Sequence, residues 1–277
     1  MKPRSNPFVR AAALAAVSLA FTAIPAHAAP ATKAATGTDL TVLAAWDVLP
    51  GSGDIATWTG TSLGAGLTVG SNVSWSGIAI SGALTNIGIT GAGSITIGAS
   101  GVTLTGNRTL TVANAVVLGS SQIWNIADVT GDTNTDATFG AISGGTFGIT
   151  KTGAGTLSIG TSTYTGATVI DGGTLHLAGT NNTSGFTVNS GATLMVSGNF
   201  RIQGKNVTLN GGTFNNNNSF VEVGLMTMTD GTISPINGGY FRANSGYVLN
   251  GSNTISSGSY YINIDGNNSS GVFDVQS

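Results

Sequence analysis

Outside the N-terminal region, only one histidine could serve a hydrolytic site. A Ser–His–Asp triad needs a histidine that accepts the serine proton. His176 stands between Leu175 and Leu177, and strand alternation turns both leucines inward and the histidine outward. No paired nucleophile motif accompanies it. The sequence therefore predicts a solvated surface histidine and no catalytic residue.

The carboxylates are spread along the chain. A glycan-cleaving site needs carboxylates clustered on one face, for metal binding or for acid and base catalysis at set separations. Asp171 and Asp230 each precede a glycine, a pairing typical of turns. Glu222 precedes Asp230 and should project from a different strand, and Asp265 stands further on. A polysaccharide lyase or glycoside hydrolase is therefore the second hypothesis, after a non-enzymatic chain.

One segment has part of the spacing of a calcium-binding loop. Asp132, Asn134 and Asp136 match its first three ligand positions. The sixth and twelfth positions need a glycine and a glutamate but hold Ala137 and Ser143. A polar loop is the favoured interpretation and a weak Ca²⁺ site the alternative. The sequence points to no other metal and to no cofactor.

Aromatic residues cluster near the end of the sequence. They could form a surface on which sugars stack. Strand alternation buries about half of them, however, so a core aromatic stack is favoured. The residues are Tyr240, Phe241, Tyr247, Tyr260 and Tyr261.

The elements that would position these residues are short strands. After residue 60 the chain reads as triplets in which apolar residues flank a small or polar one, as in Leu67-Thr68-Val69 and Ile95-Thr96-Ile97. This is the period of two of a half-buried strand, and β-branched residues suit it. No segment beyond the N-terminal region has helical periodicity, so almost no helix is expected.

The last third of the sequence repeats with a period of about twenty. Gly191, Gly211, Gly231 and Gly251 recur at that interval. A fixed period of this length favours a repeat array over a sandwich or an up-and-down barrel. We therefore predict an all-β fold, a parallel β-helix with three short strands in each coil. A second register stacks Arg201, Glu222 and Arg242 into a ladder of alternating charge.

Composition and charge exclude several classes of protein. Of 277 residues, 43 are glycine, none is cysteine and 7% are charged. Disulfides and thiolate metal sites are therefore excluded, while 40% hydrophobic residues argue against a disordered chain. Beyond residue 28, six lysines and arginines face eleven carboxylates, a net charge of −5. Nucleic acid is disfavoured as a partner, and no later segment suits a transmembrane helix.

Residues 1–28 read as a secretory signal. Lys2, Arg4 and Arg10 precede a short apolar run, and Ala26-His27-Ala28 has the small residues of a cleavage site. Cleavage there predicts a protein that is secreted or placed on the cell surface. Residues 29–60, with Trp46 and Trp58, are expected to cover the first coil.

One stretch closely resembles a known family. Lys151-Thr152-Gly153-Ala154-Gly155-Thr156-Leu157 is followed by Tyr164-Thr165-Gly166 and Gly172-Gly173-Thr174-Leu175. Residues 143–177 as a whole are similar to the autotransporter-associated β-strand repeat, also called the passenger-associated transport repeat. Residues 48–58 resemble, more weakly, the N-terminal part of large bacterial proteins that carry such repeats. The residues that carry the main resemblance are Lys151, Thr152, Gly153, Gly155, Thr156, Leu157, Tyr164, Gly166, Gly172, Gly173 and Leu175.

The resemblance implies a bacterial secreted or cell-surface protein with a right-handed parallel β-helix. In this family the repeat is linked to folding of the passenger and to its passage through the outer membrane. Typical members end in a β-barrel translocator, whereas residues 178–277 here continue the coil pattern. The chain is thus expected to be a fragment, a short relative or a protein exported by another route.

The expected organisation follows from these observations. Residues 1–28 form the signal peptide, 29–60 the cover, 61–142 and 178–277 the β-helix coils, and 143–177 the repeat. The expected function is that of a non-enzymatic passenger segment whose repeat assists folding and export and whose rod is a stalk or adhesin. Expected partners are glycans or proteins of a host or matrix, and the outer-membrane translocation machinery.

Overall fold

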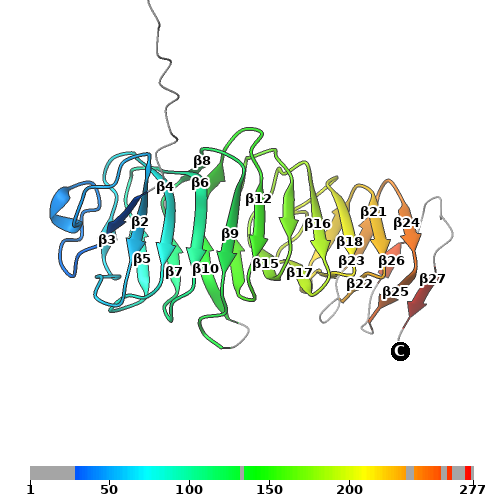
Figure 1. Cartoon of the computed structure of the whole chain (residues 1–277). Coiled ribbons are helices and arrows are strands. Elements are labelled where there is room, and N and C mark those ends of the chain that lie inside the picture. The colour runs from blue at the N-terminus through cyan, green and yellow to red at the C-terminus, as the bar shows by residue number, and fades with distance from the viewer. Residues whose placement is uncertain (1–28, 132–133, 235–239, 257–260, 264–271, 276–277) are drawn as a thin grey trace, which may run out of the picture.

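The computed structural model describes residues 29–131, 134–234, 240–256, 261–263 and 272–275. They wind into a parallel β-solenoid of about ten turns with about 21 residues in each. Figure 1 shows the strands stacked side by side along one axis. The predicted parallel β-helix is thereby confirmed, while its right-handed sense stays a prediction. The proposed signal peptide, residues 1–28, lies outside the described residues.

A sheet of thirteen described strands forms the first side of the solenoid, and its strands β8 and β11 lie off the main path, on the third side. Its pairings begin within the proposed cover segment, because β1 pairs with β2 and β2 with β4. The strands are β1 (Ala29–Thr32), β2 (Asp54–Trp58), β4 (Val73–Ile80), β6 (Ile95–Leu104), β8 (Val116–Leu118), β9 (Gln122–Ile126), β11 (Ile142–Ser143), β12 (Ile149–Thr152), β14 (Thr168–Ile170), β16 (Gly185–Asn189), β18 (Asn206–Asn210), β21 (Met226–Thr229) and β24 (Tyr247–Asn250).

The second side is a sheet of eleven described strands. They are β3 (Leu67–Thr68), β5 (Ile87–Thr90), β7 (Leu110–Val112), β10 (Thr135–Phe139), β13 (Thr156–Ile159), β15 (Gly173–Leu177), β17 (Ala192–Val196), β19 (Thr213–Asn215), β22 (Thr232–Ile233), β25 (Ser252–Ile255) and β27 (Val272–Val275). The described helix content is one 3₁₀ turn, η1 (Leu43–Ala45). No described helix has the length and hydropathy of a membrane span.

The third side has strands in the early and in the late described coils. In the early coils, Val73–Trp75 of β4 pair with Ile95–Ile97 of β6, these pair with β8, and β8 pairs with β11. In the late coils, the third side is the sheet of β20 (Phe220–Val223), β23 (Tyr240–Ala243) and β26 (Tyr261–Asn263). Between these two groups, single parallel bridges join Ile142 to Ser162 and Ser162 to Asn181. Glycine and asparagine are frequent around these bridges, and both are depleted in strands.

The core is a tube of side chains that alternate inward along each strand. Trp58, Trp75 and Trp124 are fully buried, and Trp46 packs edge-on against Trp58 with ring centroids 5.3 Å apart. Such edge-to-face pairs are favourable beyond the area they bury. Among the clustered aromatics, Phe241 and Tyr247 are buried and Tyr240 faces outward, as alternation predicts. The side chains of Tyr260 and Tyr261 lie outside the described set.

The period of twenty holds only approximately. Gly191, Gly211 and Gly251 adopt positive φ at equivalent corners, but at the fourth corner Asp230 does so, with φ +52°, in place of Gly231. This shift of the positive φ by one residue arises because one coil is slightly shorter than twenty residues: Leu209 pairs with Met228. One step of the predicted charge ladder is confirmed, since Glu222 pairs in register with Arg242.

Candidate functional site

The region that resembles the transport repeat is a corner between the first and second sheets, where coils approach closely. Lys151 on β12 points into the core, in register between Trp124 and Ile170. Its side chain is fully buried. Its Nζ donates to the carbonyls of Thr152 at 3.3 Å, Gly153 at 2.9 Å and Gly172 at 2.8 Å. An internal ammonium thus ties two successive coils together.

The glycines of this corner allow the two coils to touch. Gly173 has φ +60°, and a Cβ there would overlap the carbonyls of Ala154 and Gly155 in the preceding coil. Gly153 adopts φ +79°. A Cβ on Gly172, in the next coil, would lie only 3.3 Å from the carbonyl oxygen of Gly153. A side chain at Gly173 would therefore force the coils apart.

Asp136, the third residue of the possible calcium loop, belongs to this corner. Its buried carboxylate accepts hydrogen bonds from the amide of Val129 at 2.9 Å and from the amide and hydroxyl of Thr130 at 3.2 and 3.1 Å. Its other oxygen accepts from the amide of Thr156 at 2.7 Å. Asp132 lies outside the described residues. In the described part of the chain no three His, Cys, Asp or Glu side chains gather as metal ligands.

Burial changes the acidity of Lys151. Desolvation of the ammonium lowers the pKa of Lys151 to about 8, and the negative charge of Asp136 partly opposes this shift. A buried charge is costly unless it is hydrogen-bonded, and the three carbonyls supply those bonds. An amine enclosed by backbone has no space for a substrate, so the arrangement is structural.

A second polar chain runs through the core of the repeat, from a buried tyrosine to the next coil. The hydroxyl of Tyr164 lies 2.8 Å from Thr168 Oγ1. Thr168 donates to Thr183 Oγ1 at 3.1 Å, which donates to the Gly166 carbonyl at 2.6 Å. Burial raises the pKa of Tyr164 to about 12. A Cβ on Gly166 would overlap the backbone of Phe147, so this corner is closely packed as well.

We expect Tyr164→Phe to lower the free energy of unfolding by about 1 kcal/mol, the usual worth of a buried hydrogen bond. Removing the hydroxyl leaves Thr168 Oγ1 with one partner fewer while the ring stays packed. Urea unfolding read by tryptophan fluorescence would measure the change. Tyr240→Phe, on the half-buried outer side, should stay within about 0.5 kcal/mol of the parent. Equal effects in both variants would contradict a role for the chain of hydroxyls.

The remaining residues of the repeat pack or turn the coil. Leu157 and Leu175 stack in register in the second sheet, and both are buried. Thr156 pairs with Thr174, so the coil between them has fewer residues than the average coil. A Cβ on Gly155 would overlap the Ala127 carbonyl. Each of the eleven residues that carry the resemblance thus lies in or beside these two corners or the core between them.

His176 faces outward between two serines. Leu175 and Leu177 are buried on either side of it, as alternation predicts. Its Nε2 lies 2.7 Å from Ser197 Oγ and its Nδ1 3.4 Å from Ser158 Oγ. Partial burial lowers the pKa of His176. Both ring nitrogens face hydroxyls, whereas a triad needs a carboxylate to orient the imidazole.

The described carboxylates hold local backbone and amide contacts. Asp171 accepts from the side chain of Asn189, which accepts from Asn210 at 3.1 Å, a ladder along the axis. Asp230 accepts from the amide of Ser252 at 2.8 Å. Glu222 lies on the third side, and Asp265 lies outside the described residues. Asp171 and Asp230 are three coils apart along the axis and Glu222 is on another side, so these three carboxylates do not form an acid–base pair.

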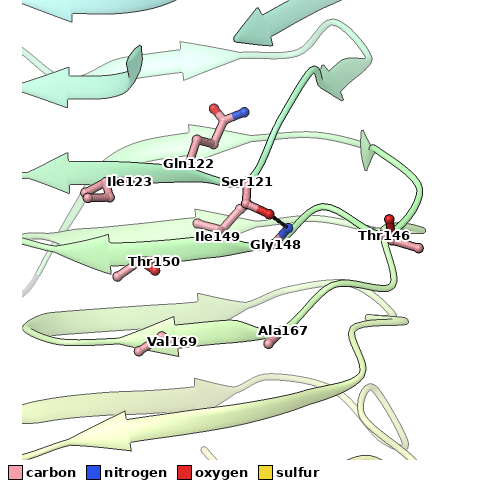
Figure 2. Close-up of a pocket in the computed structure, with 9 residues that line it drawn as sticks. All are labelled: Ser121, Gln122, Ile123, Thr146, Gly148, Ile149, Thr150, Ala167 and Val169. Atoms are coloured by element: carbon pink, nitrogen blue, oxygen red, sulfur yellow. Dashed lines mark hydrogen bonds between the residues drawn. The ribbon is translucent and has the colours of Figure 1, made fainter. Parts of the chain in front are cut away.

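A shallow pocket of about 310 Å³ lies on the outer face of the first sheet. Figure 2 shows it over β9, β12 and β14, with the amide of Gly148 donating to Ser121 Oγ at 3.1 Å. Nothing in its lining titrates near neutral pH. The lining residues are Ser121, Gln122, Ile123, Thr146, Gly148, Ile149, Thr150, Ala167 and Val169.

Comparison with known proteins gives one match. No curated protein and no solved structure matches the chain. The family model described as passenger-associated-transport-repeat matches residues 149–177, which run from β12 to the end of β15. Residues 149–177, which contain the corner of Lys151 and Gly173 and the corner of Tyr164, therefore match the passenger-associated transport repeat.

Proposed function

We propose that the protein is a non-enzymatic passenger-type rod, secreted or held at the bacterial cell surface, whose repeat assists folding and export. The rod serves as a stalk or adhesin, and the outer-membrane translocation machinery is its partner during export. The observation that best supports this proposal is the close packing of successive coils within residues 149–177. They match the family model, and within them the buried Lys151 and the glycines Gly166 and Gly173 hold successive coils in close contact.

The repeat begins a run of tight coils. Ile149 pairs with Thr168 and Thr168 with Phe186, whereas the preceding coil, from Gln122 to Ile149, is distinctly longer. Shorter loops lose less entropy on closing, and coils of a solenoid contact only their neighbours, so folding can nucleate at one place and spread. A tight coil that Lys151 fastens is suited to be that place.

Export provides the test. We expect Gly173→Ala, which pushes the stacked coils apart, to reduce the amount of full-length protein that leaves Gram-negative cells by several-fold. Gly145→Ala should be exported like the parent, because a Cβ at Gly145 has open space around it. The measurement is the protease-accessible or released protein per cell at equal synthesis. Equal export of both variants would contradict an export-assisting repeat.

Scattered carboxylates weigh against the alternative, a polysaccharide lyase or hydrolase on the same scaffold. Both classes need convergent groups, whereas Asp171 and Asp230 are engaged in local hydrogen bonds. We expect no release of reducing or unsaturated sugars from acidic or neutral polysaccharides. Clear turnover that purified protein retains after repeated chromatography would overturn the non-enzymatic proposal.

A further inference from the structure

The outer side of the third sheet carries an unusual set of aromatic and charged side chains. Phe220 on β20 is 51% exposed and pairs in register with Tyr240 on β23. Their ring centroids lie 6.3 Å apart with planes inclined by 34°. Two positions along, Glu222 and Arg242 form the next outward pair. Exposed aromatic rings beside charged groups are typical of binding surfaces.

A third aromatic ring is held outward at a conformational cost. Phe200 is 47% exposed and has φ +58°, a region that residues other than glycine rarely adopt. Its amide donates to the Phe220 carbonyl at 2.9 Å, which places it in the adjacent coil. Strain of this kind persists where the surrounding structure imposes it, and it clusters at ligand sites.

Positive charge is concentrated at the same place. Of the six lysines and arginines beyond residue 28, Lys33 and Lys151 are buried. Three of the other four, Arg201, Lys205 and Arg242, belong to these coils. The one glutamate of the chain, Glu222, accepts from the side chains of Gln203 at 3.1 Å and Asn244 at 3.5 Å. Asp230 lies in these coils too, but at the corner between β21 and β22. On the third side itself, Arg201 and Arg242 stand against Glu222, so its described charged groups sum to a positive charge in a chain whose overall charge is negative.

We propose that this third-side patch, defined by Phe200, Phe220, Tyr240, Glu222 and Arg242, binds an acidic polysaccharide. Sugar rings would stack on the aromatic faces, a carboxylate or sulfate of the polysaccharide would pair with Arg242, and Glu222 would accept from sugar hydroxyls. Rungs repeat at about 4.8 Å along the axis, which suits a polymer with a repeated charge. The inference rests on the adhesin part of the proposed function.

A peptide fits this surface less well than a glycan. Extended peptides bind by adding a strand to an open sheet edge. β23 is paired on both sides, with β20 and with β26, so the backbone groups between these strands are already used. What the patch offers is ring faces and side-chain donors and acceptors, which is the chemistry that recognises sugar rings and their hydroxyls.

Binding of the purified full-length protein to polygalacturonate and to heparin at physiological salt tests the proposal and separates uronate from sulfate recognition. We expect binding to at least one of them, weakened at least ten-fold by Phe220→Ala and several-fold by Arg242→Gln. Phe200→Gly should weaken binding while leaving the protein at least as stable, because glycine tolerates the positive φ. That combination separates a ligand contact from a folding defect.

Matched controls make the result decisive. Phe147→Ala removes an exposed phenylalanine elsewhere on the rod, and Arg108→Gln removes a cation outside the patch. Both should bind like the parent. No binding to either polysaccharide, equal binding to polyglutamate or to methyl-esterified polygalacturonate, or equal losses in the control variants would overturn the proposal. Because purified protein is used, these outcomes are independent of whether the repeat assists export.

Discussion

Gly173→Ala should lower the free energy of unfolding by about 2–5 kcal/mol. A left-handed backbone costs an L-residue about 1–2 kcal/mol, and forcing an extra methyl into a packed site adds about 1–3 kcal/mol. Both terms apply, since Gly173 has φ +60° and its Cβ would overlap two carbonyls of the coil below. Urea unfolding, read by fluorescence of Trp124 and the other buried tryptophans, measures the loss.

Gly145→Ala is the matched control for this prediction. Gly145 has nearly the same backbone angle, φ +58°, but nothing lies within 4 Å of the position that a Cβ would take. It should therefore lose only the conformational cost of about 1–2 kcal/mol. If the two variants are equally stable, close contact between coils is not what the repeat glycines provide.

Lys151 should make the protein more stable as the pH rises from about 8 towards 10. The folded pKa of Lys151 is about 8, below the 10.5 of an exposed lysine, so between these values the unfolded chain holds a proton that the folded chain has released. Stability rises with pH wherever the unfolded state binds more protons. Over two pH units the gain is roughly 2–3 kcal/mol, and below pH 8 the contribution is constant.

Lys151→Met isolates this effect. In this variant the free energy of unfolding should no longer rise between pH 8 and 10 on account of residue 151. Lys205→Met is the control and should keep this rise, because the Nζ of Lys205 donates to the Asn182 carbonyl on the surface. Readings stop near pH 10, because burial raises the pKa of Tyr164 to about 12. Above pH 10 the unfolded chain therefore loses tyrosine protons that the folded chain retains, which lowers stability. An unchanged slope in Lys151→Met would show that its ammonium is not desolvated by the fold.

The fold can be predicted from local patterns in the sequence, whereas the hydrogen bonds at the corner of Lys151 cannot. Alternation fixes which residues face the core, and the period of about twenty fixes which coils stack. Alternation also places Lys151 inward with Ile149, which is the available signal for a buried lysine. The partners of Lys151 are backbone carbonyls from two coils. Because every residue has a backbone carbonyl, the sequence does not show which carbonyls will accept from a buried lysine.

The conformation of Asp230 and the contacts of Asp136 depend on the exact lengths of individual coils, which cannot be read from the sequence. The short coil between Leu209 and Met228 moves the positive φ from Gly231 to Asp230. Asp136 fits the spacing of a calcium loop, but the fold brings the Thr156 amide of the next coil to its carboxylate. Phe200 gives no sequence sign of its left-handed conformation, because glycine or asparagine is the residue expected there.

Pulse-labelled hydrogen exchange during refolding tests most directly the claim that residues 149–177 are the coil at which the solenoid begins to fold. We expect amides of β12 to β15 to become protected before those of β18, β21 and β24, and Gly173→Ala to remove this lead. Protection of the repeat at the same time as the later coils, or after them, would contradict the claim.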